Sequence, residues 1–157
     1  MDQTADDDGR EPTAEGPLAV SRLFEGSEGI ATARHLARDF LTEVRSLHGL
    51  PVSGRAMGTV ELVVSELVTN ARKYAPGPCL LTLVVRGGII EITVRDSNTA
   101  LPAVSARDPH RIGGHGLEVV MAVCRNFQVH REPSGKRVTA MLELTDGPDG
   151  HATGPHP

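Results

Sequence analysis

Residues 57–76 read MGTVELVVSELVTNARKYAP, and this stretch decides the fold because its pattern is helical and largely apolar. The predicted helix covers residues 54–74 and stops before Pro76-Gly77-Pro78, since proline disfavours helical backbone in the residue before it. One narrow polar stripe is predicted to face solvent: Glu61, Ser65, Thr69 and Arg72. Aliphatic side chains cover nearly all of the remaining circumference: Leu62, Val63, Val64, Leu67 and Val68. We therefore expect the helix to be buried on most sides.

Three functional side chains interrupt the apolar part of this helix. Glu66, Asn70 and Lys73 follow one another at i, i+4 and i+7, so they project together, away from the predicted solvent stripe. Because a buried charge needs a partner, either Glu66 and Lys73 form an internal ion pair, or all three face a ligand cavity. In a cavity Glu66 could act as a general base, the Asn70 oxygen could bind Mg²⁺, and Lys73 could meet phosphate.

The flanking segments predict an α+β fold. A helix is expected to start near Glu28, capped by Ser27, and to end at Gly49 and Pro51. After the central helix we expect two strands joined by Gly87-Gly88, a long loop, a third helix and two more strands: residues 80–86, 89–95, 97–112, 117–125, 127–131 and 137–144. This order predicts a two-layer α/β sandwich, whose mixed, mostly antiparallel sheet is covered on one face by helices.

Asp96 is the second sign of a site. Side chains alternate along a strand, so Asp96 shares the apolar, core-facing row of Ile90, Ile92 and Val94. A carboxylate in that row needs a hydrogen-bond donor. The donor is either a turn formed through Ser97 or Asn98, or the exocyclic amino group of a ligand.

Glycines before the third helix are the third sign. Gly113, Gly114 and Gly116 precede the amphipathic run that begins at Leu117, and a glycine-rich helix start offers N–H groups and a positive dipole end to an anion. Together the three elements predict a purine nucleotide site, with the base at Asp96, Mg²⁺-triphosphate at Asn70 and the glycines, and residues 97–112 as a lid.

Composition and charge set the class of protein. Aromatic residues make up 3% of the 157 residues, which argues against stacking on nucleic acid, and no stretch is apolar enough to span a membrane. Residues 1–17 carry a charge of −5 and residues 146–157 carry −2, so 18–145 carries +3 of the total −4. We expect a folded domain over 18–145 between two disordered tails, the first of which could instead be an acidic interaction arm. Without a secretory signal, a cytoplasmic protein is expected.

At this point the residues resemble the GHKL ATPases, which share the Bergerat fold. The run Glu66-Leu-Val-Thr-Asn70-Ala-Arg-Lys73-Tyr74-Ala resembles their N-box. Val94-Arg-Asp96 followed by Pro102 resembles the G1 box, and Gly114-His-Gly116-Leu117 resembles the G2 box and the end of the ATP lid. The order and spacing agree over residues 20–144, and the wording SELVTNA in a short chain looks most like the bacterial anti-sigma factor serine kinases.

The resemblance implies roles for these residues. Asn70 would chelate Mg²⁺, Glu66 would activate the attacking group and Asp96 would bind the adenine amino group. Lys73, Gly113, Gly114, Gly116 and Leu117 would belong to the ATP site. The implied protein is a serine kinase that phosphorylates a small antagonist protein and sequesters a sigma factor. It would form a possible homodimer and would bind neither a membrane nor nucleic acid directly.

Two departures from the family pattern keep a second class open. Asp96-Ser-Asn-Thr-Ala100 replaces the usual Asp-x-Gly-x-Gly, and Gly135-Lys136 replaces a frequent Gly-Thr. These changes favour a non-catalytic ATP-binding, partner-switching module. Glu66 favours the kinase, because a pure binder does not need a carboxylate beside the Mg²⁺ site.

Overall fold

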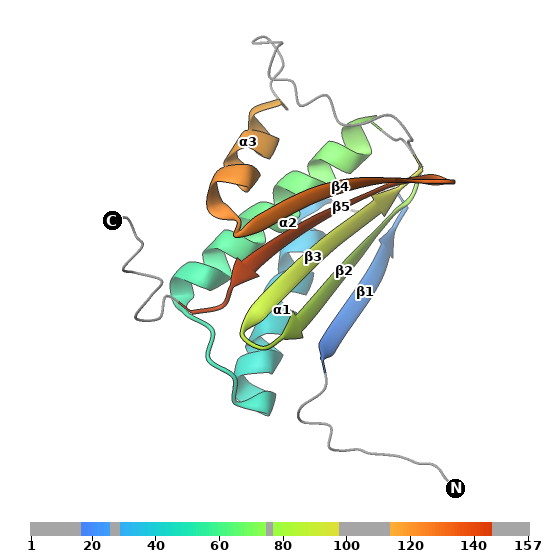
Figure 1. Cartoon of the computed structure of the whole chain (residues 1–157). Helices are drawn as coiled ribbons and strands as arrows, with labels where there is room; N and C mark the ends of the chain where they lie inside the picture. Colours follow the sequence, from blue (N-terminus) through green and yellow to red (C-terminus); the bar gives the residue numbers. More distant parts are fainter. Residues whose placement is uncertain (1–16, 26–28, 75–76, 98–113, 146–157) are drawn as a thin grey trace, which may run out of the picture.

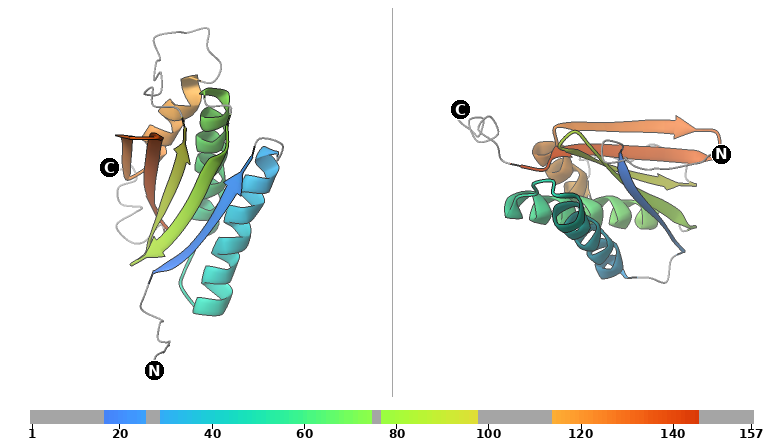
Figure 2. Two further views of the ribbon diagram at one scale, coloured as in Figure 1. Left: turned by 90° about the vertical axis from the view of Figure 1, so that its right-hand side faces the viewer. Right: turned by 90° about the horizontal axis from the view of Figure 1, so that it is seen from below.

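Three helices and five strands form two layers in the part of the chain that the computed structural model describes, which is residues 17–25, 29–74, 77–97 and 114–145 (Figure 1). In chain order they are β1 (Leu18–Phe24), α1 (Ile30–His48), α2 (Gly54–Tyr74), β2 (Cys79–Arg86), β3 (Ile89–Asp96), α3 (Gly114–Val123), β4 (Asn126–Glu132) and β5 (Gly135–Glu143). The helices cover one face of the sheet, as Figure 2 shows from two further directions. The predicted α+β sandwich is confirmed.

The sheet has the strand order β1-β2-β3-β5-β4. Each of its four pairings is antiparallel, so the sheet contains no parallel pair among the described strands. Gly87 and Gly88 join β2 to β3 with φ values of 61° and 81°, a left-handed backbone that favours glycine and matches the twist of a two-residue hairpin. The hairpin expected from this glycine pair is confirmed.

The sequence pattern missed the first strand, β1. Its sequence LAVSRLF lacks clean alternation, because Ser21 and Arg22 stand together in its middle. As an edge strand it needs only one partner, β2, and the Ser21 hydroxyl lies 3.0 Å from that of Thr82 across the pair. Phe24 anchors the end of the strand in the core, where it is 1% exposed. The strand therefore forms through its pairing with β2, and the periodicity of its own sequence does not predict it.

Helix α1 starts and ends at glycines. Its N-cap is Gly29, and the expected Ser27 cap lies outside the described residues. At the other end Gly49 takes a left-handed conformation (φ 67°), and its N–H donates to the carbonyl of Val44, as a helix-terminating glycine does. The buried side chains of the helix lie at helical spacing: Ala33, Ala37, Phe40, Leu41 and Val44.

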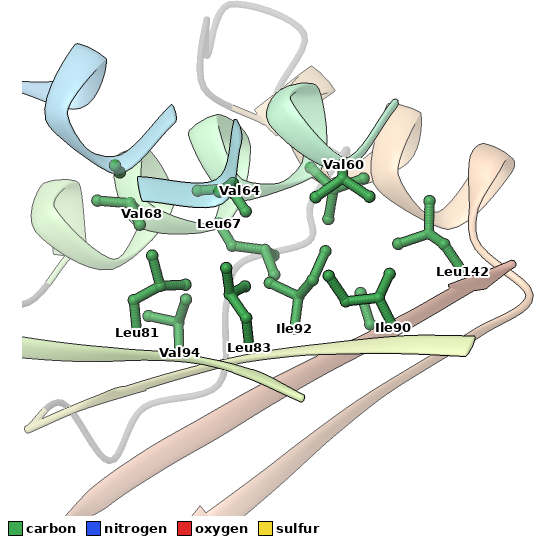
Figure 3. Close-up of a cluster of buried hydrophobic side chains, with 14 of the residues drawn as sticks. Val60, Val64, Leu67, Val68, Leu81, Leu83, Ile90, Ile92, Val94 and Leu142 are labelled. Atoms are coloured by element: carbon green, nitrogen blue, oxygen red, sulfur yellow. The ribbon is translucent and has the colours of Figure 1, made fainter. Parts of the chain in front are cut away.

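Helix α2 has the predicted bounds and packs an aliphatic face on the sheet. Figure 3 shows Val60 near Ile90 and Leu142 at one end of this contact, and Val68 near Leu81 and Val94 at the other. These side chains are almost fully buried, so each leaves water at a gain of about 1.5–3 kcal/mol before entropy costs.

The polar stripe of α2 was predicted to face solvent, but part of it is covered by α1. Arg38 of α1 donates two hydrogen bonds to Glu61, Nε to Oε2 at 3.0 Å and Nη2 to Oε1 at 3.1 Å. This contact lowers the pKa of Glu61. Leu62, expected to be buried, is instead 38% exposed. Because α1 packs along α2, the covered sector of the helix includes part of the polar stripe.

Helix α3 also differs from its expected span. It begins at Gly114 and ends at Val123, so it starts three residues earlier and stops two residues sooner than predicted. It ends here because the Arg125 N–H donates a hydrogen bond to the Met141 carbonyl of β5 at 2.8 Å, so the chain leaves the helix and joins the sheet. None of the helices in the described ranges is long and apolar enough to cross a membrane. The predicted tails fall outside those ranges, apart from Pro17.

Candidate functional site

Asn70 and Asp96 lie at the same end of the sandwich. The register pairs Leu80, near the start of β2, with Arg95, near the end of β3. Since β2 follows α2 after a short connection, the last turn of α2 and the last residue of β3 share one end of the molecule. The core contacts agree, because Val68 lies near Val94 (Figure 3). Asn70 and Asp96 follow these two residues by two positions in the chain.

The three polar side chains of α2 differ in exposure. Glu66 is half-buried, Asn70 is buried at 8% exposure, and Lys73 is exposed. Within the described part of the chain Glu66 and Lys73 form no ion pair, so the simpler of the two predicted arrangements is not observed. The buried amide of Asn70 sits one turn beyond the half-buried carboxylate of Glu66.

Lys73 borders a different space from the one expected. With Thr69 and Arg72 it lines an open hollow of about 460 Å³, which is completed by Gly29 and Ile30 at the start of α1. The hollow lies at the same end of α2 as Asn70, but between α1 and α2. The structure therefore brings Lys73 beside Arg72, where two cations face an open space.

Asp96 has a donor that the sequence analysis did not identify. The Lys136 ammonium lies 2.8 Å from Asp96 Oδ2, and each of the two side chains is 1% exposed. The pairing of β3 with β5 sets Asp96 directly opposite Lys136. Neither predicted donor, a turn residue or a ligand, accounts for this bond. The available signal was that Lys136 shares the core-facing row of β5 with Val138, Ala140 and Leu142.

Gly135 lets the start of β5 lie close to the end of β3. A Cβ at this position would lie 1.8 Å from the carbonyl oxygen of Asp96 and 2.8 Å from Ser97 Cα, where no side chain fits. Glycine is therefore required for the backbone of β5 to approach that of β3 at this point. The close approach fixes Lys136 against Asp96.

The glycine-rich helix start is described only in part. Gly113 lies outside the described residues, and Gly114 and Gly116 fall in the first turn of α3. In Figures 1 and 2 this end of α3 lies beside the C-terminal end of α2. Leu117 is 2% exposed and belongs to the core, so its side chain anchors the helix start. The N-terminus of α3 thus adds backbone N–H groups and a positive dipole end to the region of Asn70.

The two ends of the expected nucleotide site fit a ligand differently. At the phosphate end, a buried amide oxygen, a nearby carboxylate and a helix N-terminus are groups that suit Mg²⁺ and an anion. At the base end, the acceptor is already bonded by an internal ammonium. The residues at the phosphate end therefore fit Mg²⁺-phosphate, and at the base end Oδ2 of Asp96 accepts a hydrogen bond from Lys136.

Comparisons with known proteins agree with this architecture. Residues 29–142 match the family described as the histidine kinase-like ATPase domain. Among solved structures, the RsbU and RsbW domains of Rv1364c from Mycobacterium tuberculosis match with a TM-score of 0.57 and 17% identity, over 82% of this chain and 32% of that one. The histidine kinase domain of the blue-light activated histidine kinase EL346 from Erythrobacter litoralis matches with a TM-score of 0.46 and 18% identity, over 73% and 62%.

The present chain thus spans about a third of the first of these structures and under two thirds of the second. No curated protein matches. At 17% identity the first of these structures bears on the fold alone.

Proposed function

The chain belongs to the histidine kinase-like ATPase family, and from this premise we propose that it is a Mg-ATP-binding regulatory protein that acts as an anti-sigma factor-like serine kinase. The observation that carries the proposal is the polar face near the end of α2. There a buried Asn70 follows a half-buried Glu66 by one helical turn, next to the N-terminus of α3. This pair interrupts the sector of α2 that is largely aliphatic.

Each candidate residue has a proposed role. The Asn70 side-chain oxygen would hold Mg²⁺, which neutralises charge on the phosphates when bound. Glu66 would accept the proton of the attacking serine hydroxyl. Gly113, Gly114 and Gly116 would bring backbone N–H groups to the phosphates, with Leu117 anchoring that turn, and Lys73 would attract the triphosphate. Asp96 would mark the base end of the site.

The proposed partners are a sigma factor and a small antagonist protein that carries the phosphorylated serine. Support comes from the SELVTNA motif of α2, which resembles the anti-sigma factor kinases. The similarity in fold to the chain that contains RsbU and RsbW domains is consistent with that branch. A cytoplasmic location and a possible homodimer belong to the same proposal, which includes neither a membrane nor a nucleic acid among the partners.

Two observations favour a second function, a non-catalytic partner-switching module that binds nucleotide without transferring phosphate. The buried Asp96–Lys136 pair and the missing glycines after Asp96 both alter the base end of the site. The two functions differ in whether a phosphoryl group leaves the nucleotide.

Calorimetry with Mg-ATP tests the shared part of the proposal. Asn70→Ala should weaken binding at least tenfold, because it removes a ligand of the metal that bridges protein and phosphates. Asn126→Ala, which truncates an exposed asparagine at the start of β4, is the matched control and should bind like the unmodified protein. Equal affinity in the Asn70 and Asn126 variants would overturn the site.

Phosphoryl transfer separates the two functions. The protein is incubated with labelled ATP and with candidate antagonist proteins from its own genome, and labelled serine is located by mass spectrometry. The kinase should label one antagonist, and Glu66→Gln should keep nucleotide bound while transfer falls about 10²–10⁴-fold. Nucleotide binding without any transfer would favour the partner-switching module.

A further inference from the structure

Asp96 and Lys136 stand apart from the other charged residues of the structure. Among the described residues they are the two charged ones that are buried, and their side chains meet at 2.8 Å. Every other ion pair between described residues has at least one side chain with substantial exposure, as in Arg125–Glu143 at 60% and 48%. A buried pair in this position needs an explanation, because removing two charges from water is costly.

The backbone keeps Lys136 from withdrawing. Asp96 and Lys136 are cross-strand partners at the joined ends of β3 and β5, and the neighbouring Gly135 touches the Asp96 backbone closely. Val138 continues the same core-facing row at 3% exposure. The ammonium is therefore held at the carboxylate by the register of the sheet.

A purine amino group is a weaker donor to this carboxylate than the ammonium. The ammonium–carboxylate bond is charge-assisted, whereas an exocyclic amino group is neutral. If the base displaced Lys136, a buried ammonium would lose its counter-charge, which costs more than the neutral hydrogen bond returns. The exchange is unfavourable, so Oδ2 stays with Lys136, and a base could bond only to Oδ1 of a carboxylate whose charge the ammonium already neutralises.

We propose that Lys136 is a specificity-determining residue, which neutralises the Asp96 carboxylate, weakens the hydrogen bond that a purine amino group could form to it, and so leaves the protein with little preference for adenine. Affinity then comes from the triphosphate and Mg²⁺ at the end of α2. This inference rests on the proposed nucleotide-binding function. It adds the class of ligand, which is a purine nucleoside triphosphate whose amino group the protein does not recognise.

Two triphosphates that differ only in the amino group test the proposal: ATP and purine riboside triphosphate. Their dissociation constants for the full chain are measured by calorimetry with Mg²⁺. The unmodified protein should bind both within about threefold of each other, because no hydrogen bond from the amino group to a charged acceptor is gained. A preference for ATP of about tenfold or more, the effect expected of such a bond, would overturn the proposal.

Removing the competing cation should create the missing preference. In Lys136→Thr the hydroxyl is short and uncharged, so Asp96 becomes an acceptor for the base, and ATP should gain about tenfold over purine riboside triphosphate. Arg125→Thr removes an exposed cation and is the matched control, with an unchanged ratio. An unchanged ratio in folded Lys136→Thr would also overturn the proposal.

The outcomes separate the inference from the function beneath it. If Lys136→Thr does not fold, as circular dichroism would reveal, the ratio in the unmodified protein decides alone. Binding of both triphosphates supports the function and the inference. Binding of ATP with strong discrimination supports the function and refutes the inference. Binding of neither triphosphate refutes both.

Discussion

Two ion pairs of the same chemistry, one buried and one at the surface, differ in their surroundings. The difference distinguishes a pair whose loss should destabilise the fold from a pair whose loss it should tolerate. Asp96–Lys136 joins two strands inside the sandwich, with both side chains 1% exposed. Arg38–Glu61 joins α1 to α2 at the surface, where the Arg38 side chain is 55% exposed. Both have good hydrogen-bond geometry, at 2.8 and 3.0 Å. Burial, and not distance, decides what each loss costs, since water replaces a lost partner only at the surface.

The largest expected effect comes from breaking the buried pair on one side. Lys136→Met keeps most of the side-chain volume but leaves Asp96 without its ammonium partner. The free energy of unfolding should fall by about 3–5 kcal/mol, a large part of the stability of a domain of this size. Urea denaturation followed by circular dichroism measures the loss. A fall no greater than that caused by Glu61→Gln at the surface pair would contradict the burial of Asp96 and Lys136 in the structure.

The second effect tests the close approach that fixes the buried pair. Gly135→Ala introduces a Cβ against the Asp96 carbonyl, so the start of β5 must move away from β3. The cost should be about 3 kcal/mol, the upper range for overpacking. Gly58→Ala is the matched control, because a Cβ there meets no atom within 4 Å and alanine is the better helix former. It should leave stability unchanged or slightly higher in the same denaturation experiment.

The smallest effect is expected at the surface pair and depends on pH. The hydrogen bonds from Arg38 lower the pKa of Glu61 below the ordinary 4.5. A lowered pKa in the folded state gives stability that is present above the unfolded value and is lost as the pH falls through the folded value. Glu61→Gln should therefore be slightly less stable than the unmodified protein at pH 7, and the difference should shrink as the pH falls below 4.5 in the same denaturation experiment.

Salt sharpens the same contrast. Raising NaCl to 1 M, where the screening length is about 3 Å, should shrink the Glu61→Gln effect and leave the Lys136→Met effect nearly unchanged. Equal sensitivity of both variants to salt would contradict the assignment of one pair to the interior and the other to the surface.

The sequence predicted elements that depend on local spacing. The bounds of α2 follow from the helical spacing of its aliphatic residues and the proline-rich stop, and the β2–β3 hairpin follows from Gly87-Gly88. Edge strand β1 was not predicted, because Ser21 and Arg22 interrupt the alternation of apolar and polar residues. Among site residues, Asn70 and Asp96 are buried as their positions on apolar faces implied, whereas Lys73 is exposed beside α1.

Local patterns in the sequence were enough to predict the helices and all the strands except β1, and that a carboxylate and an amide would fall on apolar faces, because those features repeat within a few residues. Only the tertiary structure decided what those groups meet. Lys136 reaches Asp96 across 40 residues and Arg38 reaches Glu61 across 23. Such contacts are set by strand register and helix packing, which depend on the whole core and leave no local period in the sequence.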